Sequence, residues 1–114
     1  MITADEANAR IRKRLARAVE HLAAWNARHT HAIDRLQWIG SIVESAVTES
    51  VCTEVLGALD AGRTVEGVHE YAANRGRTLG KFGAQKSTAP LDASIHAETI
   101  RAWFEIVDVL EGNA

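Results

Sequence analysis

The chain has 114 residues, of which 46% are apolar and 25% charged, and its formal net charge is −2. No run of about 18 apolar residues occurs, which excludes a transmembrane helix, and a single cysteine, Cys52, excludes an internal disulfide. We therefore expect one domain, residues 1–114, that works in the cytoplasm without membrane contact.

The first predicted helix covers residues 3–28. Thr3 and Glu6 have the spacing of a capping box, in which both side chains satisfy backbone amides of the first turn. Apolar residues then recur every three or four positions, which places them on one face of a helix. The members of this stripe are Ile11, Leu15, Ala18, Val19, Leu22 and Trp25.

A second apolar series predicts another long helix, from His31 to Ala61. Its members are Ile33, Leu36, Ile39, Val43, Val47, Val51, Val55 and Leu59. Thr30 would cap this helix, and Cys52 within it is expected to be a small buried apolar residue. The alternative is one unbroken helix of about 57 residues, about 85 Å long, which would need a coiled-coil partner.

Gly62 is expected to end the second helix in the left-handed conformation. Thr64 would then cap a short third helix, Val65–Asn74, which Gly76 closes. Residues 76–89 are rich in glycine, serine and threonine, and we expect them to form a loop.

The last predicted helix runs from Leu91 to Leu110, with Pro90 in its first turn and Gly112 after its end. No segment alternates with a period of two, so no sheet is expected. The sequence thus predicts an all-α bundle of three to four helices, with two long N-terminal helices and a packed C-terminal helix. Because the long apolar stripes exceed what the short helices cover, we expect a homo-oligomer, most simply a homodimer.

Two basic segments stand out against an otherwise acidic chain. Residues 7–19 and 71–91 contain Lys and Arg but neither Asp nor Glu. A helix face with several cations neutralises phosphates by charge and counterion release, without reading a base sequence. The candidate polyanion-binding residues are Arg10, Arg12, Lys13, Arg14, Arg17, Arg75, Arg77, Lys81 and Lys86. The alternative is that these cations pair with acidic faces of the assembly.

The segment 75–86 has two further interpretations. Its glycines would let backbone amides approach an anion closely, so a loop here could contact phosphate. Residues 63–82 also partly match a helix-turn-helix, since Ala72 and Gly76 have the spacing of that motif's alanine and turn glycine. Gly80 would fall in the recognition helix, where it disfavours helical structure.

Metal and enzyme chemistry have little support. Glu66 and His69 have the Glu-x-x-His spacing of ferritin-like helices, but the second pair that such sites need is missing unless a dimer supplies it. Cys52 and the serines lack the surroundings of an activated nucleophile. We expect no metal, no cofactor and no enzymatic activity.

The leading functional hypothesis is a small helical binding module that oligomerises and engages an acidic partner, most simply nucleic acid, through segments 10–17 and 75–86. The alternative is a protein–protein interaction or scaffolding subunit, such as an accessory or phage-type host-interaction protein, without nucleic-acid contact. Salt dependence of binding separates the two hypotheses.

Overall fold

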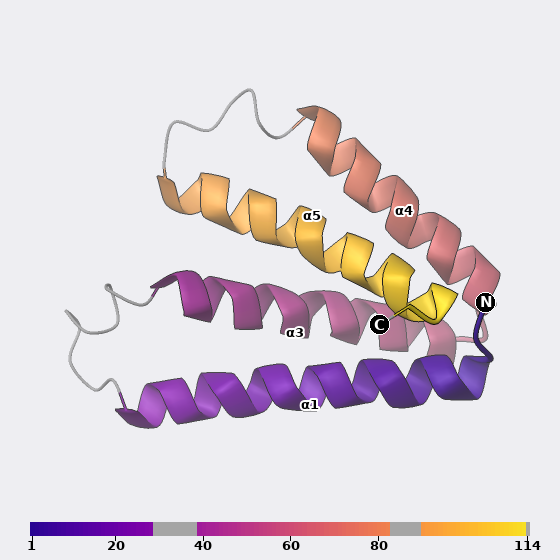
Figure 1. Cartoon of the computed structure of the whole chain (residues 1–114), viewed down its shortest axis with the longest axis horizontal. Helices are drawn as coiled ribbons and strands as arrows, with labels where there is room; N and C mark the ends of the chain where they lie inside the picture. Colours follow the sequence, from indigo (N-terminus) through magenta and orange to yellow (C-terminus); the bar gives the residue numbers. More distant parts are fainter. Residues whose placement is uncertain (29–38, 83–89, 114) are drawn as a thin grey trace.

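The computed structural model describes residues 1–28, 39–82 and 90–113. These residues form four helices: α1 (Ala4–Arg28), α3 (Ile39–Asp60), α4 (Val65–Phe82) and α5 (Pro90–Glu111). Figure 1 shows two antiparallel helix pairs, α1 with α3 and α4 with α5. The two pairs are packed together mainly by contacts between α3 and α5. The prediction of an all-helical bundle with two long N-terminal helices is confirmed.

The start of α1 and the course of the first pair agree with the sequence. The backbone amide of Glu6 donates to the Thr3 hydroxyl at 3.2 Å, so Thr3 caps α1 as predicted. Because α1 and α3 pack side by side, the alternative of one unbroken helix is wrong. The predicted break at His29–His31 lies outside the described residues.

The turn between α3 and α4 is also as predicted. Gly62 has a φ of 91°, and the amide of Arg63 donates to the carbonyl of Ala58 at 3.1 Å, which closes α3. The Thr64 hydroxyl then accepts from the amide of Gly67 at 3.0 Å and caps α4. A left-handed glycine followed by a capping threonine is a strong local signal.

The predicted end of α4 at Asn74, with Gly76 as its cap, is wrong. The helix continues through Gly76 and Gly80 to Phe82, so residues 76–82 are not a loop, and the helix-turn-helix interpretation fails with them. Gly76 is buried beneath the ring of Phe104 on α5, where a Cβ atom would lie 2.8 Å from Cζ. This glycine therefore allows two helices to approach closely and does not mark a turn. The remainder of the predicted loop, residues 83–89, lies outside the described part.

The core fills the end of the bundle where α1 begins and α5 ends. Its buried members are Ala7, Ile11, Val51, Cys52, Val55, Leu56, Val65, Val68, Ala72, Ala102, Trp103, Ile106, Val109 and Leu110. Trp103 is the largest of them, and Tyr71 meets its ring edge-on with centroids 5.6 Å apart. The amide of Ile2 donates to the carbonyl of Leu110 at 3.0 Å, which ties the N-terminal segment to this end.

The opposite end is packed less completely. Ile39 on α3 and Ile95 on α5 belong to the predicted apolar faces, yet they are 37% and 42% exposed. Leu22, Trp25 and Ile42 are half-buried there. This end therefore holds the hollows that are described below. Within the described ranges, no helix is both long enough and apolar enough to cross a membrane.

Candidate functional site

Basic side chains of α1 follow one side of the helix. Arg10, Lys13, Arg14, Arg17, His21 and Arg28 are spaced by three, four or seven residues, and we call this set the basic stripe. Such spacing brings successive side chains to the same face. At 1.5 Å per residue, the stripe extends about 27 Å from Arg10 to Arg28.

Two members of the basic stripe have carboxylate partners. Arg14 Nη1 lies 2.9 Å from Glu105 Oε2 on α5, and both side chains are about one-third exposed. Arg10 pairs loosely with Glu6 one turn earlier, at 3.9 Å. The first pair joins two helices, whereas the second lies within α1.

Lys13 and Arg17 are exposed, and neither has an ion-pair partner among the described residues. Together with Arg10 and Arg14 they line an open hollow of about 350 Å³ on the α1 face. Four cationic side chains therefore border one hollow, and carboxylates partner only Arg10 and Arg14 among the described residues, so the surface there is positive.

Arg12 is not part of this surface. Its Nε donates to Asn8 Oδ1 at 2.6 Å, and its guanidinium group lies 3.5 Å from Asp60 Oδ2 at the end of α3. Although the sequence grouped Arg12 with the other α1 cations, the structure places it on the flank that joins α1 to α3.

Arg101 on α5 joins Arg14 of α1 in an ion-pair network beside the basic stripe. Arg101 donates to Glu98 Oε2 at 2.5 Å and also pairs with Glu105, which holds Arg14 from its other oxygen. Burial alone lowers the pKa of Arg101, but the hydrogen bonds and charges of Glu98 and Glu105 outweigh it and raise that pKa above its ordinary value. This network is a structural link between α1 and α5.

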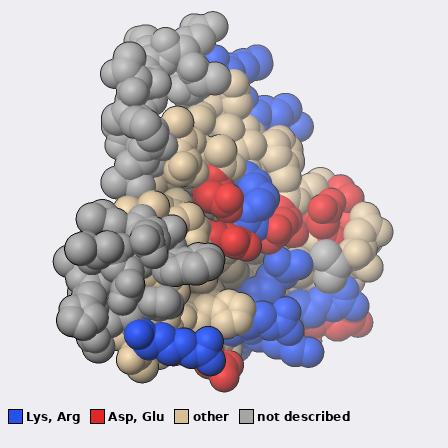
Figure 2. All heavy atoms as spheres, turned by 60° about the vertical axis from the view of Figure 1, so that its left-hand side comes forward, with Lys and Arg blue, Asp and Glu red and all other residues tan. Residues whose placement is uncertain are grey.

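The second predicted basic segment lies on α4, at the far side of the bundle from α1. Arg75 lies over the Trp103 ring, with its Cζ atom 5.8 Å from the centroid, and Arg77 donates to Asn74. Lys81 is exposed, and Lys86 lies outside the described residues. Figure 2 shows the two groups of Lys and Arg apart, with the charged cluster of α5 between them. The two segments therefore do not form one continuous surface.

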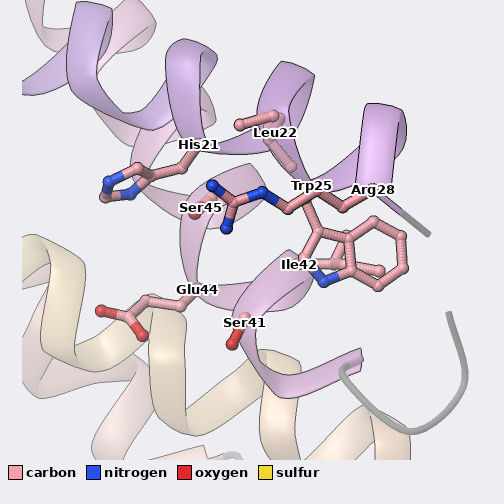
Figure 3. Close-up of a pocket in the computed structure, with 9 residues that line it drawn as sticks. His21, Leu22, Trp25, Arg28, Ser41, Ile42, Glu44 and Ser45 are labelled. Atoms are coloured by element: carbon pink, nitrogen blue, oxygen red, sulfur yellow. The ribbon is translucent and has the colours of Figure 1, made fainter. Parts of the chain in front are cut away.

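A pocket lies at the Arg28 end of the basic stripe, between α1 and α3. Its volume is about 340 Å³, and we call it the end pocket. The residues that line it are His21, Leu22, Ala24, Trp25, Arg28, Ser41, Ile42, Glu44 and Ser45. In the view of Figure 3, the guanidinium group of Arg28 lies between His21 and Trp25, above the serines of α3.

A smaller hollow of about 200 Å³ connects the end pocket with the middle of the stripe. It shares His21, Glu44 and Ser45 with the end pocket and is also bordered by Arg14 and Arg17. The basic stripe and the end pocket therefore form one continuous site along α1.

The other residues considered for chemistry have structural roles. His69 Nε2 lies 2.8 Å from Glu111 Oε1, which joins α4 to α5, and the described part of the chain contains no group of three metal-ligand side chains. Cys52 is 1% exposed, as predicted. Burial raises the pKa of its thiol to about 11, so the thiolate is disfavoured at neutral pH.

Sequence reasoning missed His21 and Arg28 as members of the site. The predicted basic segment ended at Arg17, because no Lys or Arg follows it for ten residues. The same helical spacing continues past Arg17, since His21 and Arg28 lie on the same side of α1, one and three turns further on.

Comparison of the chain with protein-family models, with curated proteins and with solved structures finds no match.

Proposed function

We propose that this protein is a small, non-enzymatic helical module that binds nucleic acid through the basic stripe of α1 and acts as a homodimer. The observation that carries the proposal is a row of basic side chains about 27 Å long, of which Lys13 and Arg17 are exposed and have no carboxylate partner among the described residues. A phosphate backbone carries charge at regular intervals along its length. A linear row of basic side chains therefore matches a phosphate backbone better than it matches a compact anion.

We assign the main nucleic-acid contact to one helix, α1. On α4, Arg75 packs against an aromatic ring and Arg77 bonds to Asn74, so these side chains are already engaged within the fold. On α1, the cations border open hollows instead. We therefore assign the main contact to the basic stripe, and give the α4 cations a minor role.

Binding of a fluorescent duplex of mixed sequence at several salt concentrations tests the proposal. If Arg10, Lys13, Arg17 and Arg28 contact phosphates, log K falls with log salt with a slope of about −3 to −4, which weakens binding about 100-fold between 50 and 200 mM. Absence of binding at 50 mM salt overturns the proposal.

Self-association is the second part of the proposal, and an apolar groove of about 520 Å³ between α3 and α5 supports it. The groove is lined by Ile39, Ile42, Val43, Ala46, Val47, Ser50, Val51, Ile95 and Thr99. None of these described lining residues is charged, so they offer a charged partner no opposite charge. A second copy would bring the same apolar surface, and a two-fold interface pairs one patch with itself.

Light scattering on the purified chain measures this directly. We expect the mass of a dimer, and we expect Ile95→Lys to give a monomer with unchanged helical content. Because Ile95 is 42% exposed, the lysine can be solvated in a monomer. If the wild-type protein is a monomer at micromolar concentration, the proposed self-association is wrong. The proposed nucleic-acid binding by the basic stripe does not depend on that result.

A protein partner without nucleic acid is the second candidate function. The same apolar groove favours it, since an apolar helix of another protein would fit between α3 and α5. A monomer that binds no nucleic acid at low salt supports this candidate.

A further inference from the structure

The apolar groove and the hollow beside the basic stripe use different faces of α3. The hollow of about 200 Å³ is bordered on α3 by Glu44, Ser45 and Thr48. The groove is bordered on α3 by a separate set, which is Ile39, Ile42, Val43, Ala46, Val47, Ser50 and Val51. At 3.6 residues per turn, the mean directions of the two sets differ by about half a turn. The groove therefore lies on the side of α3 that is opposite to the hollow.

Helix α5 separates the same two surfaces. Arg101 and Glu105 border the hollow, whereas Ile95 and Thr99 border the groove, about a third of a turn away around α5. Glu105 also pairs with Arg14 of the basic stripe on the hollow side. Since α3 packs between α1 and α5 (Figure 1), these three helices form a layer. The basic stripe borders one side of this layer and the groove lies on the other.

The chemistry of the groove suits a second copy of this chain. A two-fold interface places a residue near the same residue of the partner, so a charge there would face a like charge. The described lining residues carry no charge that such pairing would oppose. Ala46 and Ser50 are small and exposed, which allows a second α3 helix to approach closely. The same contact would cover the exposed side chains of Ile39 and Ile95.

A dimer of this kind leaves both basic stripes outside its interface. Each stripe lies on the side of its layer away from the groove, so the two stripes face in opposite directions. Two layers of helix, together about 20 Å thick, separate the outer faces. A duplex is stiff over this length, so a duplex that follows one stripe does not bend round to the other.

We infer that the protein bridges nucleic acid, because a dimer joined through the apolar groove holds one segment on each of its two basic stripes. This inference rests on the proposed function, to which it adds the simultaneous binding of two segments.

A capture experiment with two short duplexes of mixed sequence tests the inference at 50 mM salt. A duplex of about 12 bp is about 41 Å long, which is enough to cover one stripe. The first duplex is biotinylated and fixed to beads, the protein is bound to it, and free protein is washed away. The second duplex, which is fluorescent, is then added. We expect beads that carry the protein to retain at least about tenfold more fluorescence than beads without it.

Variants of the groove assign the capture to the dimer. Ile95→Lys and Ile39→Lys should each abolish capture of the second duplex, since both replace exposed apolar side chains of the groove by a charge. Ala97→Lys is the matched control, because it adds the same charge at an exposed position of α5 outside the groove lining, and it should keep capture. Affinity for a single duplex, measured by anisotropy, should change less than about threefold in all three variants, which also shows that they are folded.

If the wild-type protein binds the first duplex but captures no second one, the inference is wrong and the proposed nucleic-acid binding stands. Capture that persists in both Ile95→Lys and Ile39→Lys also overturns the inference, because bridging then does not need the groove. If the first duplex is not bound at 50 mM salt, the proposed function itself fails.

Discussion

The ring of Phe104 covers Gly76. A Cβ atom on Gly76 would lie 2.8 Å from Phe104 Cζ and 2.9 Å from Cε2, closer than non-bonded carbons approach. The ring is 40% exposed, so it seals the seam between α4 and α5 from the solvent side. A glycine in the middle of a helix costs about 1 kcal/mol relative to alanine, and here the close approach of two helices offsets that cost.

Gly76→Ala is therefore expected to lower the free energy of unfolding by about 1 kcal/mol, since overpacking outweighs the gain in helix propensity. Gly57 in α3 is a matched control, because nothing lies within 4 Å of a Cβ atom there. Gly57→Ala should raise stability by up to about 1 kcal/mol. Urea unfolding measures both values, and equal stabilisation by the two substitutions would refute the packing role of Gly76.

Because the Cys52 thiol is buried, we expect the free energy of unfolding of the protein to fall in alkali. Burial is the main cause that raises the pKa of its thiol from 9.0 to about 11, and Glu105 adds to it while Arg14 opposes it. The unfolded thiol ionises near 9.0. The contribution of the neutral thiol to the free energy of unfolding is therefore fully present below pH 9. It is lost as the pH rises towards 11. The loss should reach about 1 kcal/mol by pH 10.

Urea unfolding of wild type and Cys52→Ala at pH 8 and pH 10 isolates this contribution. Both proteins share every other titrating group, so the difference between their pH dependences belongs to the thiol. Cys52→Ala should lose about 1 kcal/mol less than wild type between the two pH values. If both proteins lost the same free energy of unfolding between the two pH values, the pKa of the Cys52 thiol would not be raised in the folded protein.

Glu105→Gln should weaken the fold and strengthen nucleic-acid binding. The carboxylate holds both Arg14 and Arg101, and its loss is expected to cost about 0.5–1 kcal/mol because the pairs are partly exposed. Arg14 then becomes available for phosphate, so the salt slope should steepen by about one. Anisotropy at several salt concentrations measures this slope.

Glu98→Gln is the control for that experiment. It removes a carboxylate from Arg101 but leaves the Arg14–Glu105 pair in place. Its stability should fall while its salt slope stays that of wild type. A steeper slope in both variants would mean that general charge, rather than the release of Arg14, controls binding.

Local signals in the sequence predicted most helix ends correctly. Thr3, Gly62, Thr64 and Gly112 act through backbone geometry and capping within a few residues, so their effects can be read without tertiary structure. Gly76 misled the prediction of α4 because its role depends on Phe104, a residue 28 positions away. A glycine selected for close packing cannot be distinguished from a turn glycine in one sequence.

The site was predicted in part. The cationic run on α1 was visible, and its helical spacing already placed most of it on one face. The pairing of Arg14 with Glu105 and of Arg12 with Asp60 depends on tertiary contacts, as does the separation of the α4 cations from α1. The end pocket could not be predicted, because Trp25 and Ser45 become neighbours only when α1 and α3 pack together.

The central claim is that the basic stripe of α1, rather than the α4 segment, holds the nucleic acid. Two double variants test it most directly: Lys13→Gln with Arg17→Gln on α1, and Arg77→Gln with Lys81→Gln on α4. All four side chains are exposed, so neither variant should unfold the protein, and each removes two charges. At 50 mM salt we expect the α1 variant to bind oligonucleotide at least about tenfold more weakly and to have a salt slope reduced by about two, whereas the α4 variant should change affinity less than threefold. Equal losses in the two variants, or a larger loss in the α4 variant, would contradict it.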